Sequence, residues 1–414
     1  MLALRLARGA HPGVQLRRLL VATASAATGF LLLGTLGHAL AHQDTPGGSA
    51  LRLAWCLAPL AATVYFAVTV ARTDPGTKPR PGLSAIGLGP GRLMAVSATT
   101  TALACTLGSM LALLFFLHLR GDLTGMPFDG DAADFLAADH PLPLPAALTL
   151  LTLVPVAASI AVALVLRPRD ARRRTTGASG TPSASAPDSA SRPAAPTPGP
   201  AETAAQEPGL PSPHLPPRDL PWGIAVLAAG LAVEAYAARA PHTRLAMPGG
   251  ATGSPAAVLV GWTLTALGLA LAGPGLTHLC GRLLQAVRPG ALRLLAGRVL
   301  MQEATRIGRP LGVVCAVASG AYAMVVLYDA DDPSLGPLTT LGALVVAGCA
   351  VATLLTAAAE ARHARADTTA ALVRLGAPAT TLRTAAGLRA AALLALFAPL
   401  TFLIAELAAL PLTA

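Results

Sequence analysis

Nine apolar segments, each about as long as a membrane-spanning helix, restrict this chain to very few folds. Because the hydrocarbon core of a bilayer is about 30 Å thick, a helix needs about 20 apolar residues to cross it. The segments are residues 19–41, 51–71, 93–118, 145–166, 220–239, 255–279, 310–329, 336–359 and 385–411. Only 12% of all residues are charged, whereas soluble domains carry about 25%. We therefore predict an all-α integral membrane protein with about nine transmembrane helices.

The positions of the basic residues predict the orientation of these helices. If the N-terminus is cytoplasmic, the inside segments hold 25 of the 30 basic residues; they are 1–18, 72–92, 167–219, 280–309 and 360–384. The outside loops and their edges hold four, Arg52, Arg120, Arg239 and Arg244. Because basic residues concentrate in cytoplasmic loops, we expect a multi-pass protein of the plasma membrane with its N-terminus inside. These loops also explain the net charge of +10, so we expect no nucleic-acid partner.

Residues 168–219 differ in composition from the rest of the chain, since they are mainly Pro, Ala, Ser and Thr. Such a segment has too few apolar side chains to form a core, and it is predicted to be a disordered cytoplasmic linker. It follows a first membrane unit of four spans, residues 1–167. After it we expect two linking spans, residues 220–280, and a second unit of three spans, residues 281–414.

Two short patterns recur in these units in the same order. ALRLARG, Ala3–Gly9, is similar to ALRLLAG, Ala291–Gly297. GLSAIGLGPGRLM, Gly82–Met94, and ALVRLGAPATTLR, Ala371–Arg383, both fit Leu-x-x-(Ile/Leu)-Gly-x5-Leu. The separation is 80 residues from Ala3 to Leu83 and 81 residues from Ala291 to Leu372. The matched spacing indicates two similar half-units, which are common in transporters.

We expect each copy of the longer pattern to form a cytoplasmic elbow, in which a short amphipathic helix and a glycine turn lead into the next span. In the second copy Asp367 or Thr368 should cap the short helix. Gly376 should occupy the left-handed C′ position, and Pro378 the first turn of the next helix. The residues expected to present each elbow to a partner are Leu83, Ile86 and Gly87 in the first copy and Leu372, Leu375 and Gly376 in the second.

The segment EARHARADTTAALVRLGAPATTLR, Glu360–Arg383, resembles the cytoplasmic loop of FtsX-like permeases, which include the MacB, lipoprotein-release and Bce types of ABC transporter. The family pattern, (Arg/Lys)-x-x-(Glu/Asp)-x-x-x-Leu-(Arg/Lys)-x-Leu-Gly-Ala, is matched at Leu372, Leu375, Gly376 and Ala377, and Asp367 lies one residue before its acidic position. The first copy matches less well. The chain also departs from the family, because its longest outside loop has about 25 residues in place of a large extracytoplasmic domain, and nine spans are predicted where Bce-type permeases have ten.

The resemblance implies a membrane-spanning permease subunit of an ABC transporter that exports or extracts a lipid, lipopeptide or peptide. Its implied partners are membrane lipid and a separate cytoplasmic ATPase dimer, whose two similar grooves would receive the two elbows. One alternative is a non-transporting membrane partner that relays ATPase motion in signalling or cell-envelope remodelling. A proton-coupled secondary transporter is a third hypothesis, which would require a polar path at mid-membrane.

Motifs for catalysis are absent from the sequence, which has no Gly-x4-Gly-Lys-(Ser/Thr), HExxH or GxSxG. We therefore predict that the chain is not an enzyme, has no cofactor or metal, and depends on a separate subunit for ATP hydrolysis. The cysteines lie in or beside apolar segments, so we expect small buried residues rather than disulfides or zinc ligands. They are Cys56, Cys105, Cys280, Cys315 and Cys349.

Two carboxylates, Glu234 and Glu406, fall within predicted spans. A charge at the bilayer centre costs about 2.5–3.5 kcal/mol on insertion scales, so an ionisable residue there is a candidate functional site. Both are candidates for a proton or substrate path. Arg389 lies in the same predicted helix as Glu406, near its inside end, and is expected to extend its guanidinium to the membrane surface.

The topology can be tested by labelling introduced cysteines with a membrane-impermeant reagent. We expect a cysteine in the 168–219 linker to be protected in intact cells, because the basic asymmetry places that segment inside. A cysteine beside Ala414 should be labelled. Labelling of the linker in intact cells would contradict the predicted orientation.

Overall fold

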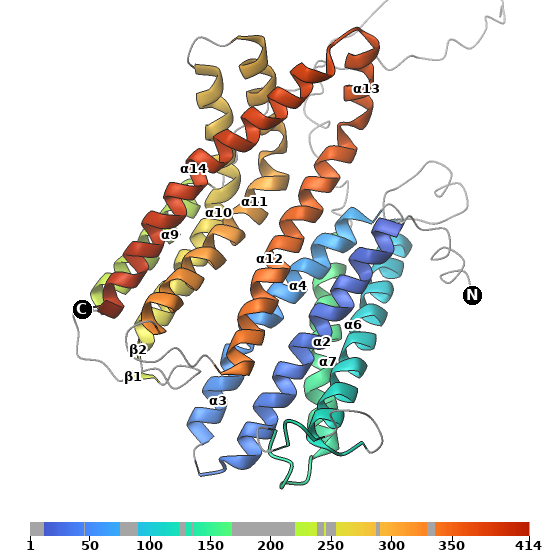
Figure 1. Cartoon of the computed structure of the whole chain (residues 1–414), viewed down its shortest axis with the longest axis vertical. Helices are drawn as coiled ribbons and strands as arrows, with labels where there is room; N and C mark the ends of the chain where they lie inside the picture. The colour runs from blue at the N-terminus through green and yellow to red at the C-terminus, as the bar shows by residue number, and fades with distance from the viewer. Residues whose placement is uncertain are drawn as a thin grey trace, which may run out of the picture.

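The computed structural model describes residues 12–44, 46–74, 90–123, 130–133, 136–167, 220–237, 244–245, 254–286, 290–328 and 336–413. These residues are overwhelmingly helical (Figure 1). The helices are α2 (Pro12–Ala41), α3 (Pro46–Trp55), α4 (Leu57–Thr73), α6 (Pro90–Arg120), α7 (Leu144–Leu166), α9 (Leu220–Ala237), α10 (Ala256–Ala286), α11 (Ala291–Tyr328), α12 (Pro337–Ala364), α13 (Ala366–Arg374) and α14 (Ala379–Thr413). Two strands of two residues each, β1 (Arg244–Leu245) and β2 (Ser254–Pro255), pair in antiparallel fashion.

Eight spans in the described part of the chain are long and apolar enough to cross a membrane. Helices α3 and α4 together form one of them, Pro46–Thr73. The ninth predicted span is α9, which has 18 residues and is the shortest of the apolar helices expected to cross. At 1.5 Å per residue α9 measures about 27 Å, slightly less than a typical bilayer core. The prediction of a multi-pass helical membrane protein is confirmed, while the count of nine spans remains a prediction.

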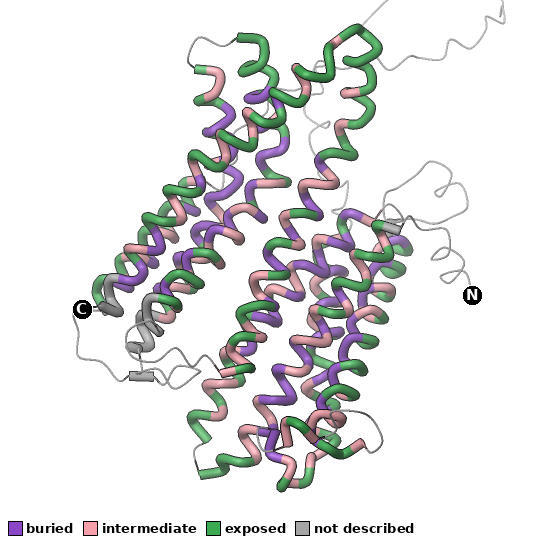
Figure 2. Tube along the Cα trace, in the orientation of Figure 1, coloured by how far each residue is buried: buried purple, intermediate pink, exposed green. Residues whose placement is uncertain are grey.

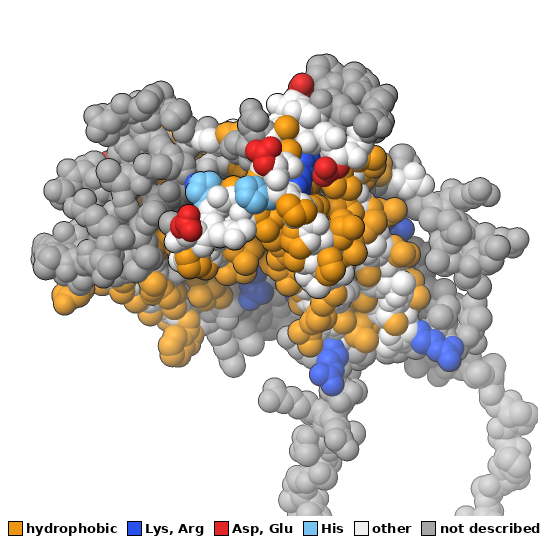
Figure 3. Space-filling view, turned by 90° about the horizontal axis from the view of Figure 1, so that it is seen from below, with side chains coloured by type: hydrophobic (Ala, Val, Ile, Leu, Met, Phe, Trp, Pro, Cys, Tyr) orange, Lys and Arg blue, Asp and Glu red, His pale blue; other side chains and the backbone are white. Residues whose placement is uncertain are grey.

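The long helices alternate in direction (Figure 1). Helices α2, α6, α9 and α11 finish at one end of the molecule, and α4, α7, α10 and α12 finish at the other. Acidic and histidine side chains are visible among hydrophobic ones on the first of these ends (Figure 3). This alternation matches the predicted order of crossings; which end faces the cytoplasm remains a prediction.

Buried hydrophobic clusters form in two groups of helices, which meet where α11 packs against α12. In one, residues of α2, α4, α6 and α7 surround Val345 and Cys349 of α12. In the other, Leu269 of α10, Cys315 of α11 and Phe397 of α14 pack together, with α9 against them. Helix α12 therefore packs with the first four spans although the sequence assigned it to the second unit. The proposed division into two half-units remains a prediction, but the packing does not follow its boundary.

Helices α9, α10 and α11 approach so closely that their backbones touch at glycines. A Cβ atom on Gly230 of α9 would lie 2.6 Å from the backbone nitrogen of Thr265, and one on Gly268 of α10 would lie 2.5 Å from that of Leu227. On the other side of α10, a Cβ on Gly273 would lie 2.1 Å from the carbonyl oxygen of Gly308 in α11. Small residues at such contacts are the usual means by which membrane helices gain close packing.

Two predicted boundaries differ from the structure. The basic stretch Ala291–Gly297, expected as an interfacial helix ahead of a span, is the first part of α11, which continues for 38 residues through Pro310. Membrane proteins tolerate an internal proline because neighbouring helices compensate for the lost hydrogen bond. Likewise, α14 begins at Ala379, ahead of the predicted span 385–411, so the turn at Gly376 leads directly into one long helix. The first copy, Ala3–Gly9, lies outside the described residues.

The glycine contacts predict which substitutions lower the stability of the protein. We expect Gly268→Ala to lower the melting temperature of the purified protein, because overpacking a close contact costs about 1–3 kcal/mol. Gly320→Ala in α11 is the matched control, since a Cβ there has nothing within 4 Å. The control should melt at or above the parent temperature, because alanine favours helix. Equal melting temperatures for the two variants would show that the close approach is not required.

Candidate functional site

The elbow of the second unit consists of α13, a turn at Gly376 and the start of α14. The predicted helix cap is wrong: the residue at the N-cap is Arg365, and Asp367 and Thr368 lie inside the first turn. The Thr368 hydroxyl donates a hydrogen bond to the Arg365 carbonyl at 2.9 Å, so it does not cap the free N–H groups. Helix α13 begins earlier than expected, at Ala366, because only Arg365 separates it from α12.

The prediction for Gly376 is confirmed. Its φ of +87° is in the left-handed region, where glycine has no steric penalty. The N–H of Gly376 donates to the carbonyl of Val373 and that of Ala377 to the carbonyl of Leu372, both at 3.0 Å. These two bonds define a Schellman motif, which ends α13 and redirects the chain. Pro378 lies just before α14, and its carbonyl accepts the N–H of Thr381.

This turn leaves apolar side chains exposed beyond the end of the membrane spans. Leu375 is 84% exposed, and Leu372 and Val373 are also exposed. The whole of α13 lies at one extremity of the molecule and has no buried residue (Figure 2). An exposed leucine on a rigid turn is suited to insertion into an apolar groove of another protein. The corresponding residues of the first elbow, Leu83, Ile86 and Gly87, lie outside the described residues.

An ion pair fixes the base of the second elbow. Arg365 Nε lies 2.8 Å from Glu303 Oε1 of α11, and the Glu303 side chain is only 10% exposed. Arg389 of α14 is close enough for its charge to act on both groups. The pair therefore ties the junction of α12 and α13 to α11. Arg389 itself is half-buried beside this pair.

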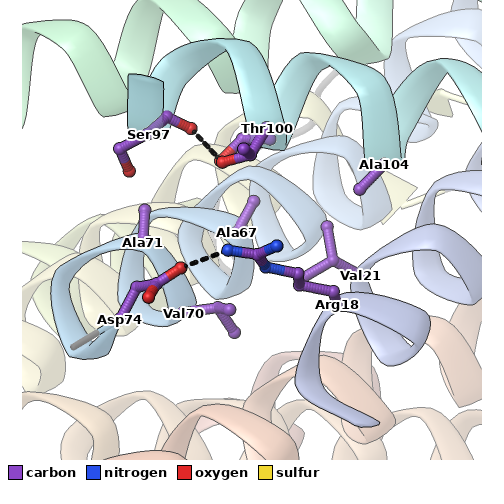
Figure 4. A pocket seen from close by; sticks show the side chains of 10 residues that line it. Arg18, Val21, Ala67, Val70, Ala71, Asp74, Ser97, Thr100 and Ala104 are labelled. Atoms are coloured by element: carbon purple, nitrogen blue, oxygen red, sulfur yellow. Dashed lines mark hydrogen bonds and ion pairs between the residues drawn. The ribbon is translucent and has the colours of Figure 1, made fainter. Parts of the chain in front are cut away.

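A second ion pair occupies the equivalent place in the first unit. Arg18 Nη2, near the start of α2, lies 2.6 Å from Asp74 Oδ2. Asp74 directly follows α4, as Arg365 directly follows α12. Figure 4 shows Arg18 reaching across a small pocket of about 20 Å³ to Asp74. In each pair, a residue in the first half of one helix, α2 or α11, is thus joined to the residue that directly follows another, α4 or α12, with the signs of the charges exchanged.

An apolar groove of about 250 Å³ lies between α2 and α12, with Phe66 of α4 at its floor. Its walls are mostly small or aliphatic residues, namely Leu20, Thr23, Ala24, Ala27, Leu344, Val345, Gly348, Cys349 and Ala352. Behind Cys349 the Thr28 and Thr63 hydroxyls are 2.9 Å apart, and Thr63 Oγ1 is 3.8 Å from Cys349 Sγ. Its lining residues all fall within helices that are long and apolar enough to cross a membrane.

The two predicted intramembrane acids are not brought together by a shared contact; each has its own partner. Glu234 of α9 is buried and accepts a hydrogen bond from the Thr265 hydroxyl of α10 at 3.0 Å. Glu406 of α14 accepts one from the Tyr322 hydroxyl of α11 at 2.6 Å. Neither partner was predicted, because a threonine or tyrosine in an apolar segment gives no sign of the helix it faces.

The five cysteines are free and buried, as predicted. Among the residues that the structure describes, no cluster of His, Cys, Asp and Glu has the arrangement of a metal site. Comparison of the chain with protein-family models, with curated proteins and with solved structures found no match. The resemblance to FtsX-like permeases therefore remains a prediction based on the elbow sequence.

The ion pair at the elbow predicts a specific loss of stability. We expect Arg365→Gln to lower the unfolding free energy by about 1.5–3 kcal/mol, because buried Glu303 loses its charged donor. Arg374→Gln is the matched control, since that exposed arginine ends the same short helix. Arg365→Lys should retain most of the parent stability. Thermal unfolding in detergent measures all three, and an Arg365→Gln variant as stable as its control would contradict the role of the pair.

Proposed function

We propose that the chain is the membrane-spanning permease subunit of an ABC transporter of the plasma membrane, driven by a separate cytoplasmic ATPase dimer. The observation that carries this proposal is the exposed elbow, in which Leu375 protrudes from a turn fixed by Gly376. An exposed apolar side chain held on a rigid turn is expected of a segment that docks into a partner protein. The sequence has no P-loop, so ATP hydrolysis is assigned to the partner.

The position of the elbow supports a role in transmitting motion. It joins α12, which packs with α2 and α4, to α14, which packs with α10 and α11. A displacement of α13 by a partner would therefore act on both helix groups at once. The Glu303–Arg365 pair adds a third attachment, to α11, at the same point.

The groove between α2 and α12 supports a lipid or lipopeptide as the transported molecule. Its lining is apolar and it lies along α12, the helix that leads directly into the elbow. A hydrocarbon chain loses no hydrogen bonds on entering such a groove, whereas a polar solute would. We therefore favour substrates with an acyl chain over purely polar ones.

Co-purification tests this proposal. The partner should be the P-loop ATPase encoded beside the gene of this chain, expressed with it and purified by a tag on the permease. We expect Leu375→Asp to abolish co-purification while the protein still inserts in the membrane, because burying an unpaired carboxylate in an apolar groove is costly. Leu372→Asp should act likewise, and Leu83→Asp and Ile86→Asp more weakly.

The matched control is Leu375→Met, which keeps an apolar side chain of similar size and should bind normally. If the Leu375→Asp variant retains the ATPase, the elbow is not its docking site. If the complex forms but moves no lipid after reconstitution in vesicles, a relay of motion in signalling or envelope remodelling replaces transport.

A further inference from the structure

The carboxyl group of Glu234 is one of the most deeply buried polar groups of the described chain. The residue is 1% exposed, and it lies in α9 three residues before the end of an otherwise apolar helix. Helix α9 packs against α10 and α14, so the side chain points into protein rather than toward lipid or water. A carboxyl in this position needs a specific explanation.

The backbone is shaped around this side chain. A Cβ atom on Gly261 of α10 would lie 2.4 Å from Glu234 Cγ, so no other residue fits at position 261 without displacing the glutamate. Gly230, one turn before Glu234, meets Thr265 and the Gly261 carbonyl in the same way. Glycines on both helices thus form a cradle that only the Glu234 side chain occupies.

The hydrogen bonds at this cradle suit a neutral carboxylic acid. Oε1 accepts the Thr265 hydroxyl at 3.0 Å, while Oε2 is buried and has no hydrogen-bond partner within the structure as described. A carboxylate there would lose its hydration and gain a hydrogen bond from one neutral donor. That single hydrogen bond is much weaker than the free energy cost of burying a charge. A protonated carboxyl carries no net charge, so its burial costs much less.

The charged and titratable groups on the neighbouring helices do not compensate for a negative charge. On α10, His278 lies 13 residues from Thr265, about 20 Å along the helix, and Arg282 lies farther still. On α14, Arg389 lies beside Glu303, and Glu406 is bound to Tyr322 of α11. A metal cation is also disfavoured, because it would require more oxygen ligands than one carboxyl and one hydroxyl.

We infer that Glu234 is a proton-binding site within the membrane, whose ligand is a hydrogen ion held on the carboxyl group in the cradle formed by Gly230, Gly261 and Thr265. The inference does not depend on the proposed permease function, since it follows from the α9–α10 pair alone.

Infrared spectroscopy of the full-length protein in lipid at neutral pH tests the inference directly. A protonated carboxyl gives a C=O stretching band distinct from that of a carboxylate. We expect such a band in the parent protein and its loss in Glu234→Gln, which has the shape of the neutral acid. In Thr265→Val the band should persist and move to higher frequency, because its carbonyl oxygen loses a hydrogen bond. A band unaffected by both substitutions would overturn the inference.

Thermal stability as a function of pH provides the second readout. If native Glu234 retains a proton that the unfolded chain releases, the native state binds more protons and stability must fall as the pH rises. Glu234→Gln should match the parent at low pH and lack this part of the decline. An identical slope in the parent and Glu234→Gln would contradict proton binding.

Discussion

Helices in a bilayer cannot be driven together by the hydrophobic effect, because lipid is as apolar as their side chains. They must gain their contacts from close packing, and here α9, α10 and α11 do so through glycines that bring backbone against backbone. The same closeness excludes water from the α9–α10 interface and makes room for one carboxyl group. Where α12 meets α2, looser packing leaves an apolar groove instead. A close glycine contact also joins α6 to α2, where a Cβ atom on Gly108 would lie 2.3 Å from the carbonyl oxygen of Ala22. The groove is therefore a local gap between α2 and α12 and does not mark a loosely packed group of helices.

The two groups of helices meet where α11 packs against α12, and the elbow joins them again. Helix α12 enters the elbow from one core and α14 leaves it into the other. The ion pair between Glu303 and Arg365 keeps the elbow attached to α11. In the proposed permease, an ATPase that moves α13 would therefore act on helices of both groups.

Sequence alone predicted the features that depend on local rules. The spans follow from the length and apolarity of each segment, and the turn at Gly376 follows from the conformational freedom of glycine. Features that depend on which helices meet were missed. Neither the Glu303–Arg365 pair nor the Thr265 donor has a local pattern, and the packing of α12 beside α2 depends on side-chain shapes across more than 280 residues of chain. The cap at Arg365 was missed because arginine is not a usual capping residue.

The two ion pairs also show how little a charge pair restricts the sequence that forms it. Coulomb attraction between opposite charges is the same whichever partner carries the positive one, so a link between two helices does not fix which helix carries which charge. Arg18 with Asp74 and Glu303 with Arg365 meet this requirement equally. The offset of 288 residues between Ala3 and Ala291 would carry Arg18 onto Arg306 and not onto Glu303. An alignment residue by residue would therefore not match the two ion pairs, although both join the first half of one helix to the residue that follows another.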